Sequence, residues 1–106
     1  MRKHLLSDLK GGWIVGDFEP NLFRSSEVEV AVKHYIAGQF EVCHHHKIAE
    51  EITVLAVGRA RMCEQTFEAG DIIHLDPNES TAFEALEDCV TVVIKRPSVP
   101  SDKYID

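Results

Sequence analysis

Three consecutive histidines, His44, His45 and His46, are followed after a short interval by Glu51. In a β-strand, residues two apart point to the same face and have Cα atoms roughly 6.5 Å apart. His44 and His46 can therefore bind one cation while His45 points to the opposite face. Two imidazoles and a carboxylate form a three-ligand set with open positions that suits Fe(II), Mn(II), Ni(II) or Zn(II). A solvated histidine cluster at the end of a strand is the alternative interpretation.

The elements that must position these residues are short β-strands. The clearest strand is expected at residues 27–36, where alternation assigns Val30, Val32 and His34 to one face and Lys33 and Tyr35 to the other. If the valine face points inward, His34 points into the interior as an additional ligand or a substrate contact. A hydrogen-bonded core histidine is equally compatible with this pattern. Further strands are expected at residues 13–15, 40–46, 52–57, 59–67, 72–75 and 89–94.

Strands that recur at intervals of about ten residues are typical of a sandwich or a barrel. The only indication of a helix lies in residues 1–10, so there are too few helical segments for parallel βαβ units. We therefore predict an all-β fold with a single domain over residues 1–106 and a barrel core at about residues 27–96. Residues 97–106 contain two prolines and are expected to form an extended tail.

The segment that holds the histidines resembles the first conserved motif of the cupin superfamily. Gly38, His44, His46, Glu51 and Gly58 occupy every fixed position of that motif, with intervals of five, one, four and six residues.

The second cupin motif is degraded in this chain. It begins at Gly70, but its proline position holds Asp76 and its glycine position holds Asn78. The position of the usual histidine ligand holds Thr81, and the final asparagine position holds Ala85. The resemblance therefore does not supply a fourth ligand.

The cupin resemblance implies an antiparallel jelly-roll β-barrel that binds a divalent transition metal (Fe, Mn, Ni or Zn) through three protein ligands. It implies that these ligands are His44, His46 and Glu51. Candidate residues that contact a small-molecule ligand are His34, Tyr35, Thr81 and Phe83. Small barrels of this kind commonly pair through sheet edges, so a homodimer is expected.

Composition narrows the classes of partner. The formal net charge is −7, which argues against nucleic acid as a partner because phosphate binding needs clustered Lys and Arg. No apolar run is long enough for a transmembrane helix, and the N-terminal residues do not resemble a signal peptide. The three cysteines show no Cys-x-x-Cys spacing and are expected to be free thiols of a cytoplasmic protein.

Two functional hypotheses follow. The first is a metal-dependent enzyme that acts on a small polar molecule such as a sugar or a sugar derivative, as an isomerase or epimerase or as a dioxygenase. The alternative is a non-catalytic module that binds a small molecule or carbohydrate and has a weakened or lost metal site. An ordered acid or base near the open coordination positions would favour the enzyme, and the sequence does not identify one.

Overall fold

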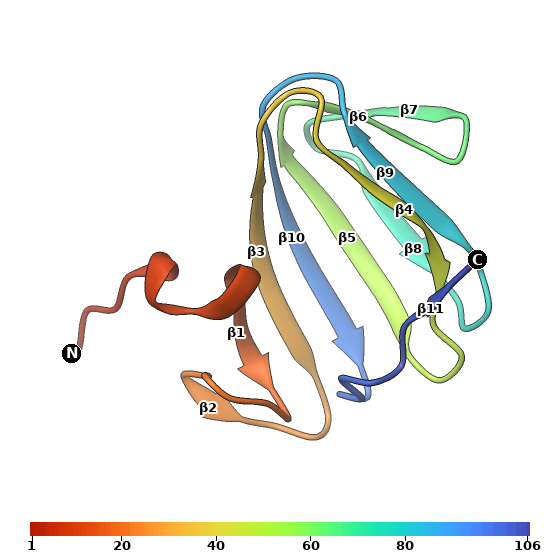
Figure 1. Ribbon diagram of the computed structural model, residues 1–106. Coiled ribbons are helices and arrows are strands. Elements are labelled where there is room, and N and C mark those ends of the chain that lie inside the picture. The colour runs from red at the N-terminus through yellow and green to blue at the C-terminus, as the bar shows by residue number, and fades with distance from the viewer.

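The computed structural model describes all residues, 1–106, as two β-sheets that face each other (Figure 1). All strand pairs are antiparallel except the short β1–β2 pair. Two short 3₁₀ turns precede the strands, η1 (Leu6–Asp8) and η2 (Lys10–Gly12). The strands are β1 (Trp13–Gly16), β2 (Phe23–Arg24), β3 (Glu29–Tyr35), β4 (Phe40–His45), β5 (Glu50–Val57), β6 (Arg59–Met62), β7 (Gln65–Glu68), β8 (Ile72–Leu75), β9 (Thr81–Ala85), β10 (Cys89–Arg96) and β11 (Tyr104–Ile105). The predicted all-β jelly-roll class is confirmed.

The first sheet has the order β2-β1-β3-β10-β5-β8, and the second has the order β11-β4-β9-β6-β7. β10 is central, as its near-continuous apolar sequence suggests, and pairs with β3 on one side and β5 on the other. β4 and β5 lie in opposite sheets, so His44 at the end of β4 faces Glu51 at the start of β5 across the interior. The structure contains no helix of the length and hydropathy that a bilayer crossing requires.

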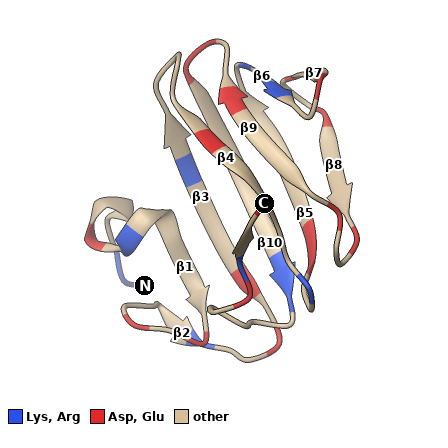
Figure 2. Cartoon of the chain, turned by 45° about the vertical axis from the view of Figure 1, so that its right-hand side comes forward, with Lys and Arg blue, Asp and Glu red and all other residues tan.

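The space between the sheets is divided into two parts. At one end, a small apolar core is formed by Leu55, Ala60, Met62, Phe83, Ala85 and Cys89. At the other end, the inward-facing residues are polar and charged, and Figure 2 shows charged bands on β3, β4, β5 and β10. The sheets therefore close over apolar side chains at one end and diverge around polar ones at the other.

The prediction that the valine face of β3 points inward is wrong. Glu29 and Ala31 are buried, whereas Val30 and Val32 on the opposite face are partly exposed and His34 is exposed. The polar face of β3 lines the polar half of the interior, so the usual rule that the more apolar face lies inside fails for this strand.

The expected strand at residues 59–67 is two strands joined by a tight turn. Cys63 and Glu64 both have positive φ, 46° and 70°, and connect β6 to β7. Neither residue type favours this left-handed conformation, so the usual Asn-Gly or Asp-Gly signal of a two-residue hairpin is missing. Gly58, in contrast, has φ 91°, and a Cβ atom there would lie 2.3 Å from the carbonyl oxygen of Asp88.

The C-terminal tail is fixed to the second sheet by specific contacts. Tyr104 and Ile105 form β11 and pair with His45 and His44 of β4. Asp102 is only 2% exposed, and its carboxylate accepts hydrogen bonds from the backbone N–H groups of residues 47, 48 and 49. The tail therefore orders the loop that joins His46 to Glu51.

Candidate functional site

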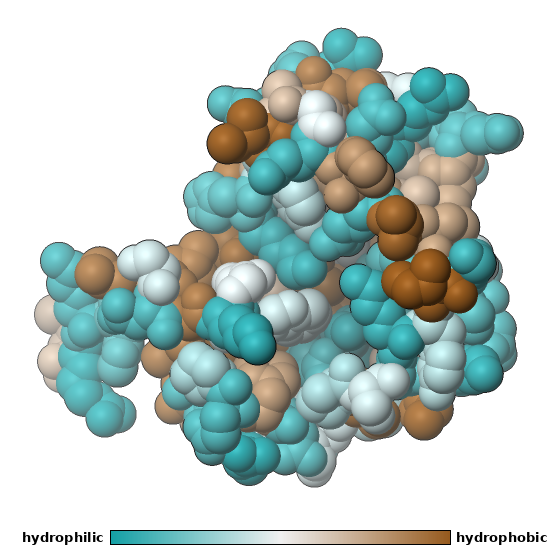
Figure 3. All heavy atoms as spheres, in the orientation of Figure 1, coloured by the Kyte–Doolittle hydropathy of each residue, from teal (hydrophilic) through white to brown (hydrophobic).

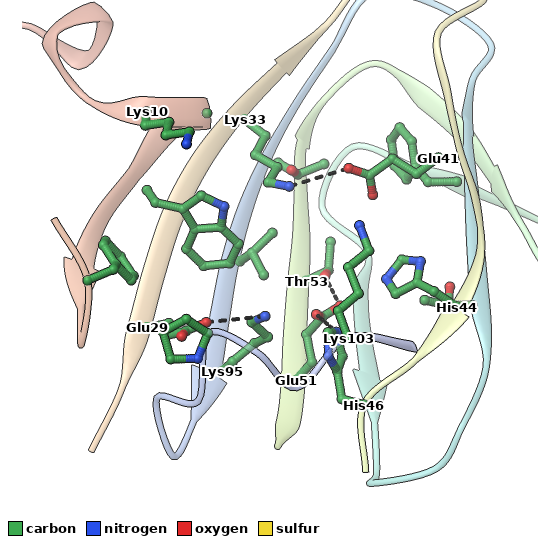
Figure 4. A pocket seen from close by; sticks show the side chains of 18 of the residues that line it. Lys10, Glu29, Lys33, Glu41, His44, His46, Glu51, Thr53, Lys95 and Lys103 are labelled. Carbon is green, nitrogen blue, oxygen red and sulfur yellow. Dashed lines mark hydrogen bonds and ion pairs between the residues drawn. The ribbon is translucent and has the colours of Figure 1, made fainter. Parts of the chain in front are cut away.

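A pocket of about 490 Å³ opens between the two sheets at their polar end (Figure 4). Figure 3 shows hydrophilic residues around the hollow on this face of the molecule. The pocket is lined from both sheets, from the N-terminal segment and from the tail. The lining residues used below are Trp13, Glu29, Lys33, Tyr35, Glu41, His44, His46, Glu51, Thr53, Thr81, Phe83, Thr91, Lys95 and Lys103.

His44 and His46 both point into the pocket from the end of β4, and each is 6% exposed. The Nδ1–H of His44 donates to the backbone carbonyl oxygen of Val42 at 2.9 Å. The Nδ1 of His46 makes the same kind of contact with the carbonyl oxygen of Asp102. Because a carbonyl oxygen can only accept, both rings carry a proton on Nδ1, and Nε2 is the nitrogen that can offer a lone pair to a metal.

Glu51 completes the group from β5 and is 8% exposed. Its Oε1 lies 3.4 Å from the Nε2 of His46, while its Oε2 accepts a hydrogen bond of 3.1 Å from the hydroxyl of Thr53. Oε1 and a neutral Nε2 are both electron-pair donors, so a proton or a cation must lie between them. Two ligand atoms held at about 2.1 Å by one tetrahedral ion are about 3.4 Å apart, so this pair fits a divalent metal.

His44 lies slightly further from this pair. Its ring centroid is 5.4 Å from that of His46, with an angle of 78° between the rings. The potential ligand atoms of His44, His46 and Glu51 do not all lie within 4.8 Å of one another. His44 would have to move to bring its Nε2 to a shared ion, while the donor types fit a transition metal.

Without a metal, His46 and Glu51 act as a coupled pair. The hydrogen bond with Glu51 raises the pKa of His46, against the opposing effect of burial. Burial alone would raise the pKa of Glu51, but the hydrogen bond and charge of His46, the charge of Lys95 and the Thr53 hydroxyl together hold it below its usual value. Glu51 is therefore an ionised carboxylate, which is the form that binds a cation.

Three of the four predicted ligand-contact residues line this pocket. Thr81 is paired with His44 across β4 and β9 and is 5% exposed, so it lies beside His44 at the position where the cupin motif has a histidine. Tyr35 and Phe83 pack together with ring centroids 4.5 Å apart. His34 does not line it and is exposed on the outer face of β3, so the expectation that His34 joins this site is wrong.

Sequence reasoning missed the ion pairs of the pocket. Lys95 and Glu29 form a buried pair at 3.2 Å, and Lys33 and Glu41 form a half-buried pair at 3.3 Å. The Nζ atoms of both lysines also lie about 5 Å from the ring centroid of Trp13, at 4.9 and 5.2 Å. The alternation of charged residues along β3 and β10 could have indicated these pairs, because Glu29, Lys33 and Lys95 share the inward face.

A second group of potential metal ligands lies outside the pocket. One ligand atom each of Glu50, His74 and Asp76 lie within 4.8 Å of one another. Glu50 is already neutralised, because Oε1 accepts a hydrogen bond from Arg96 at 2.8 Å and Oε2 lies 2.5 Å from His74. Both carboxylate oxygens of Glu50 are therefore already engaged, and His74 and Asp76 are exposed, so the pocket is the better candidate.

Comparison with known proteins identifies the fold. No protein-family model matches the sequence, and no curated protein matches it. DMSP lyase DddQ from Ruegeria pomeroyi DSS-3 is similar with a TM-score of 0.72 and 19% identity, over 88% of this chain and 49% of the lyase. This chain thus spans about half the length of that lyase.

Two further solved structures are similar along most of this chain. An uncharacterized conserved protein with a double-stranded β-helix domain from Klebsiella pneumoniae has a TM-score of 0.74 and 17% identity, over 98% of this chain and 90% of that protein. A sugar phosphate isomerase of the cupin superfamily from Silicibacter pomeroyi has a TM-score of 0.69 and 15% identity, over 76% of this chain and 57% of the isomerase. At identities of 15 to 19%, these likenesses establish a shared fold and leave activity open.

Proposed function

We propose that this chain, a cupin by its fold, is a metal-dependent enzyme that acts on a small polar molecule, with His44, His46 and Glu51 as the metal ligands. One observation carries the proposal: the Nε2 of His46 faces the ionised Oε1 of Glu51 at 3.4 Å inside a pocket. The backbone carbonyls of Val42 and Asp102 orient both imidazoles so that Nε2 is left for a metal. Such outer partners of histidine ligands are typical of metal sites.

A divalent ion held there would polarise an oxygen atom of the substrate as a Lewis acid. The chain itself would hold its ligands in place. Thr53 donates its hydroxyl proton to Glu51 and fixes the carboxylate, while the buried Thr81 leaves a short, neutral side chain next to His44. The smaller side chain leaves room for a substrate oxygen or a water molecule at the position of a fourth ligand.

Among the reaction classes, proton transfer of the isomerase or epimerase type has the better support. Burial, together with the nearby charge of Glu41, raises the pKa of Tyr35, so its phenol stays protonated and can donate to a substrate oxygen. Glu41, which is paired with Lys33, is a carboxylate in the same pocket and can accept a proton. A hydrogen-bond donor, Tyr35, and a carboxylate that can act as a base, Glu41, therefore accompany the proposed metal ligands.

The alternative is a non-catalytic binding module. Thr81 favours it, because a neutral hydroxyl in place of an imidazole weakens metal affinity and would leave the pocket as a binding site only. The two functions differ in whether the bound molecule exchanges protons with the protein.

The test has two stages. Protein purified without a histidine tag is treated with EDTA and titrated with Zn(II), Mn(II), Ni(II) and Fe(II) by calorimetry, with Glu51→Gln as the variant and Glu68→Gln, an exposed β7 carboxylate, as the control. Binding of one ion per chain that is lost in Glu51→Gln alone is expected, and no binding of any of the four would overturn the proposal.

The second stage separates an enzyme from a binding module. The loaded protein is incubated with a panel of sugars and sugar phosphates in D₂O, and carbon-bound deuterium is detected by NMR. Incorporation that depends on Glu41 supports proton-transfer catalysis, whereas binding without incorporation by any member of the panel supports the binding module.

A further inference from the structure

Four lysines line the pocket, and only two of them form an ion pair with a carboxylate. Lys10, Lys33, Lys95 and Lys103 all line it. Glu41 pairs with Lys33 and Glu29 pairs with Lys95, while Glu51 faces His46. Lys103 lines the pocket but is exposed, it makes no ion pair and no hydrogen bond, and its side chain is drawn between His44 and Thr53 in the view of Figure 4. Lys10 is likewise without an ion pair, so two ammonium groups of the pocket, those of Lys10 and Lys103, lack a carboxylate partner.

The tail holds the backbone of Lys103 in place on both sides. Asp102, the preceding residue, is buried and accepts three backbone hydrogen bonds. Tyr104, the following residue, pairs with His45 in the sheet, stacks on its ring at 5.5 Å and lies under the Nζ of Lys47 at 4.1 Å. A lysine between two anchored residues loses less backbone freedom on binding than one on a mobile tail.

We propose that the ammonium group of Lys103 binds an anionic group, a carboxylate or a phosphate, of the molecule that occupies this pocket. The assignment rests on the proposed function, since it names the class of substrate for the same site. Lysine is a compact point charge with three donors and no fixed planar geometry, so the two anion types share this recognition chemistry. The anion would lie beside the metal ligands and anchor the substrate while its neutral part reaches Tyr35 and Phe83.

The experiment uses metal-free protein, so that anion binding is measured apart from the metal. Trp13 is the single tryptophan and lines the pocket, so its fluorescence reports occupancy. The probes are malonate, inorganic phosphate and the neutral analogue malonamide. The variants are Lys103→Met, Lys103→Arg and Lys3→Met, the last of which makes the same charge change at an exposed residue outside the pocket.

We expect saturable binding of malonate or phosphate, or both, and none of malonamide. Binding should weaken at least about tenfold in Lys103→Met, in line with the loss of one charge-assisted hydrogen bond. It should be retained in Lys103→Arg and in Lys3→Met. A response to malonate only or to phosphate only identifies the anion as a carboxylate or a phosphate.

The inference is overturned if neither anion binds the wild type, or if Lys103→Met binds as tightly as the wild type. A calorimetric metal titration of Lys103→Met and the wild type keeps this outcome separate from the proposed function. Intact metal binding without anion binding refutes the role of Lys103 alone, whereas a wild type that binds anions but no metal refutes the metal site alone.

Discussion

His46 and Asp102 are joined by a hydrogen bond in which the imidazole Nδ1–H donates to the backbone carbonyl oxygen of Asp102. The carboxylate of the same aspartate accepts the N–H groups of the loop that follows His46. One tail residue therefore sets the tautomer of a proposed metal ligand and the shape of the loop that leads to Glu51. The tail therefore lines the pocket and also holds other residues of the pocket in place.

Replacement of Asp102 by alanine should lower the free energy of unfolding by about 3 kcal/mol, because three backbone donors, one of them on a buried residue, lose their acceptor. Urea denaturation measures the change. Asp8→Ala, which removes an exposed carboxylate without a hydrogen bond, is the control and should shift stability by less than about 0.5 kcal/mol. Equal small effects of both changes would show that Asp102 does not fasten the loop.

The buried Glu29–Lys95 pair gives a second prediction. Glu29→Gln leaves the ammonium group of Lys95, 9% exposed, without its partner and should cost about 3–5 kcal/mol of unfolding free energy. The double variant Glu29→Gln/Lys95→Met removes the stranded charge and should recover most of that loss. A double variant less stable than the single one would mean that Lys95 contributes chiefly through its contact with Trp13.

The contacts of Asp106 at the end of the tail should weaken in acid. Hydrogen bonds from Ser80, His45 and Cys43 lower the pKa of Asp106 to about 2, against about 3.9 in an unfolded chain. A lowered folded-state pKa stabilises the protein above about pH 4, and this contribution is lost as the pH falls toward 2. The stability difference between the wild type and Asp106→Asn should stay constant from pH 7 to about 4 and shrink below it. A difference that does not change with pH would contradict this linkage.

The predicted homodimer now has a candidate surface. The outer face of the six-stranded sheet carries neighbouring β-branched residues that are partly or fully exposed: Val30, Val32, Ile52, Val54, Ile72, Val90, Val92 and Ile94. A contiguous apolar face of this kind is typical of an interface, and we expect two copies to pack through it rather than through sheet edges.

Analytical ultracentrifugation tests this surface. The wild type should sediment with twice the chain mass of 11.9 kDa, and Val92→Lys, at the centre of the face, should sediment as a monomer. Leu22→Lys places the same charge at another exposed apolar residue and should leave the dimer intact. A wild type that is monomeric at micromolar concentration would contradict the predicted homodimer.

The outer face of the six-stranded sheet shows that the sequence predicts the positions of strands but not which face of a strand lies inside. Strand positions follow from alternation and turn residues, so β3, β4 and β10 lie within a few residues of their predicted bounds. Alternation does not say which face is inside. In β3 the valines lie outside and the charges inside, which placed His34 wrongly.

The composition of the site could be predicted only where the residues are close in sequence. His44, His46 and Glu51 lie within one motif, and strand geometry alone puts the two histidines on one face. Asp102 and Lys103 reach the pocket through tail contacts; the bond from Lys47 to Asp102 joins residues 55 positions apart. Such long-range contacts leave no local pattern, so Lys103 could not be assigned before the fold was known.

The contrast among the three adjacent histidines tests the metal centre most directly. His44 and His46 line the pocket, whereas His45 points to the other side of β4 and contacts Asp106. In calorimetric titrations with Zn(II), Mn(II) or Ni(II), His44→Ala and His46→Ala should each abolish binding, while His45→Ala and His74→Ala should leave it nearly intact. Equal losses in His44→Ala, His45→Ala and His46→Ala, or a loss confined to His74→Ala, would contradict a metal centre in the pocket.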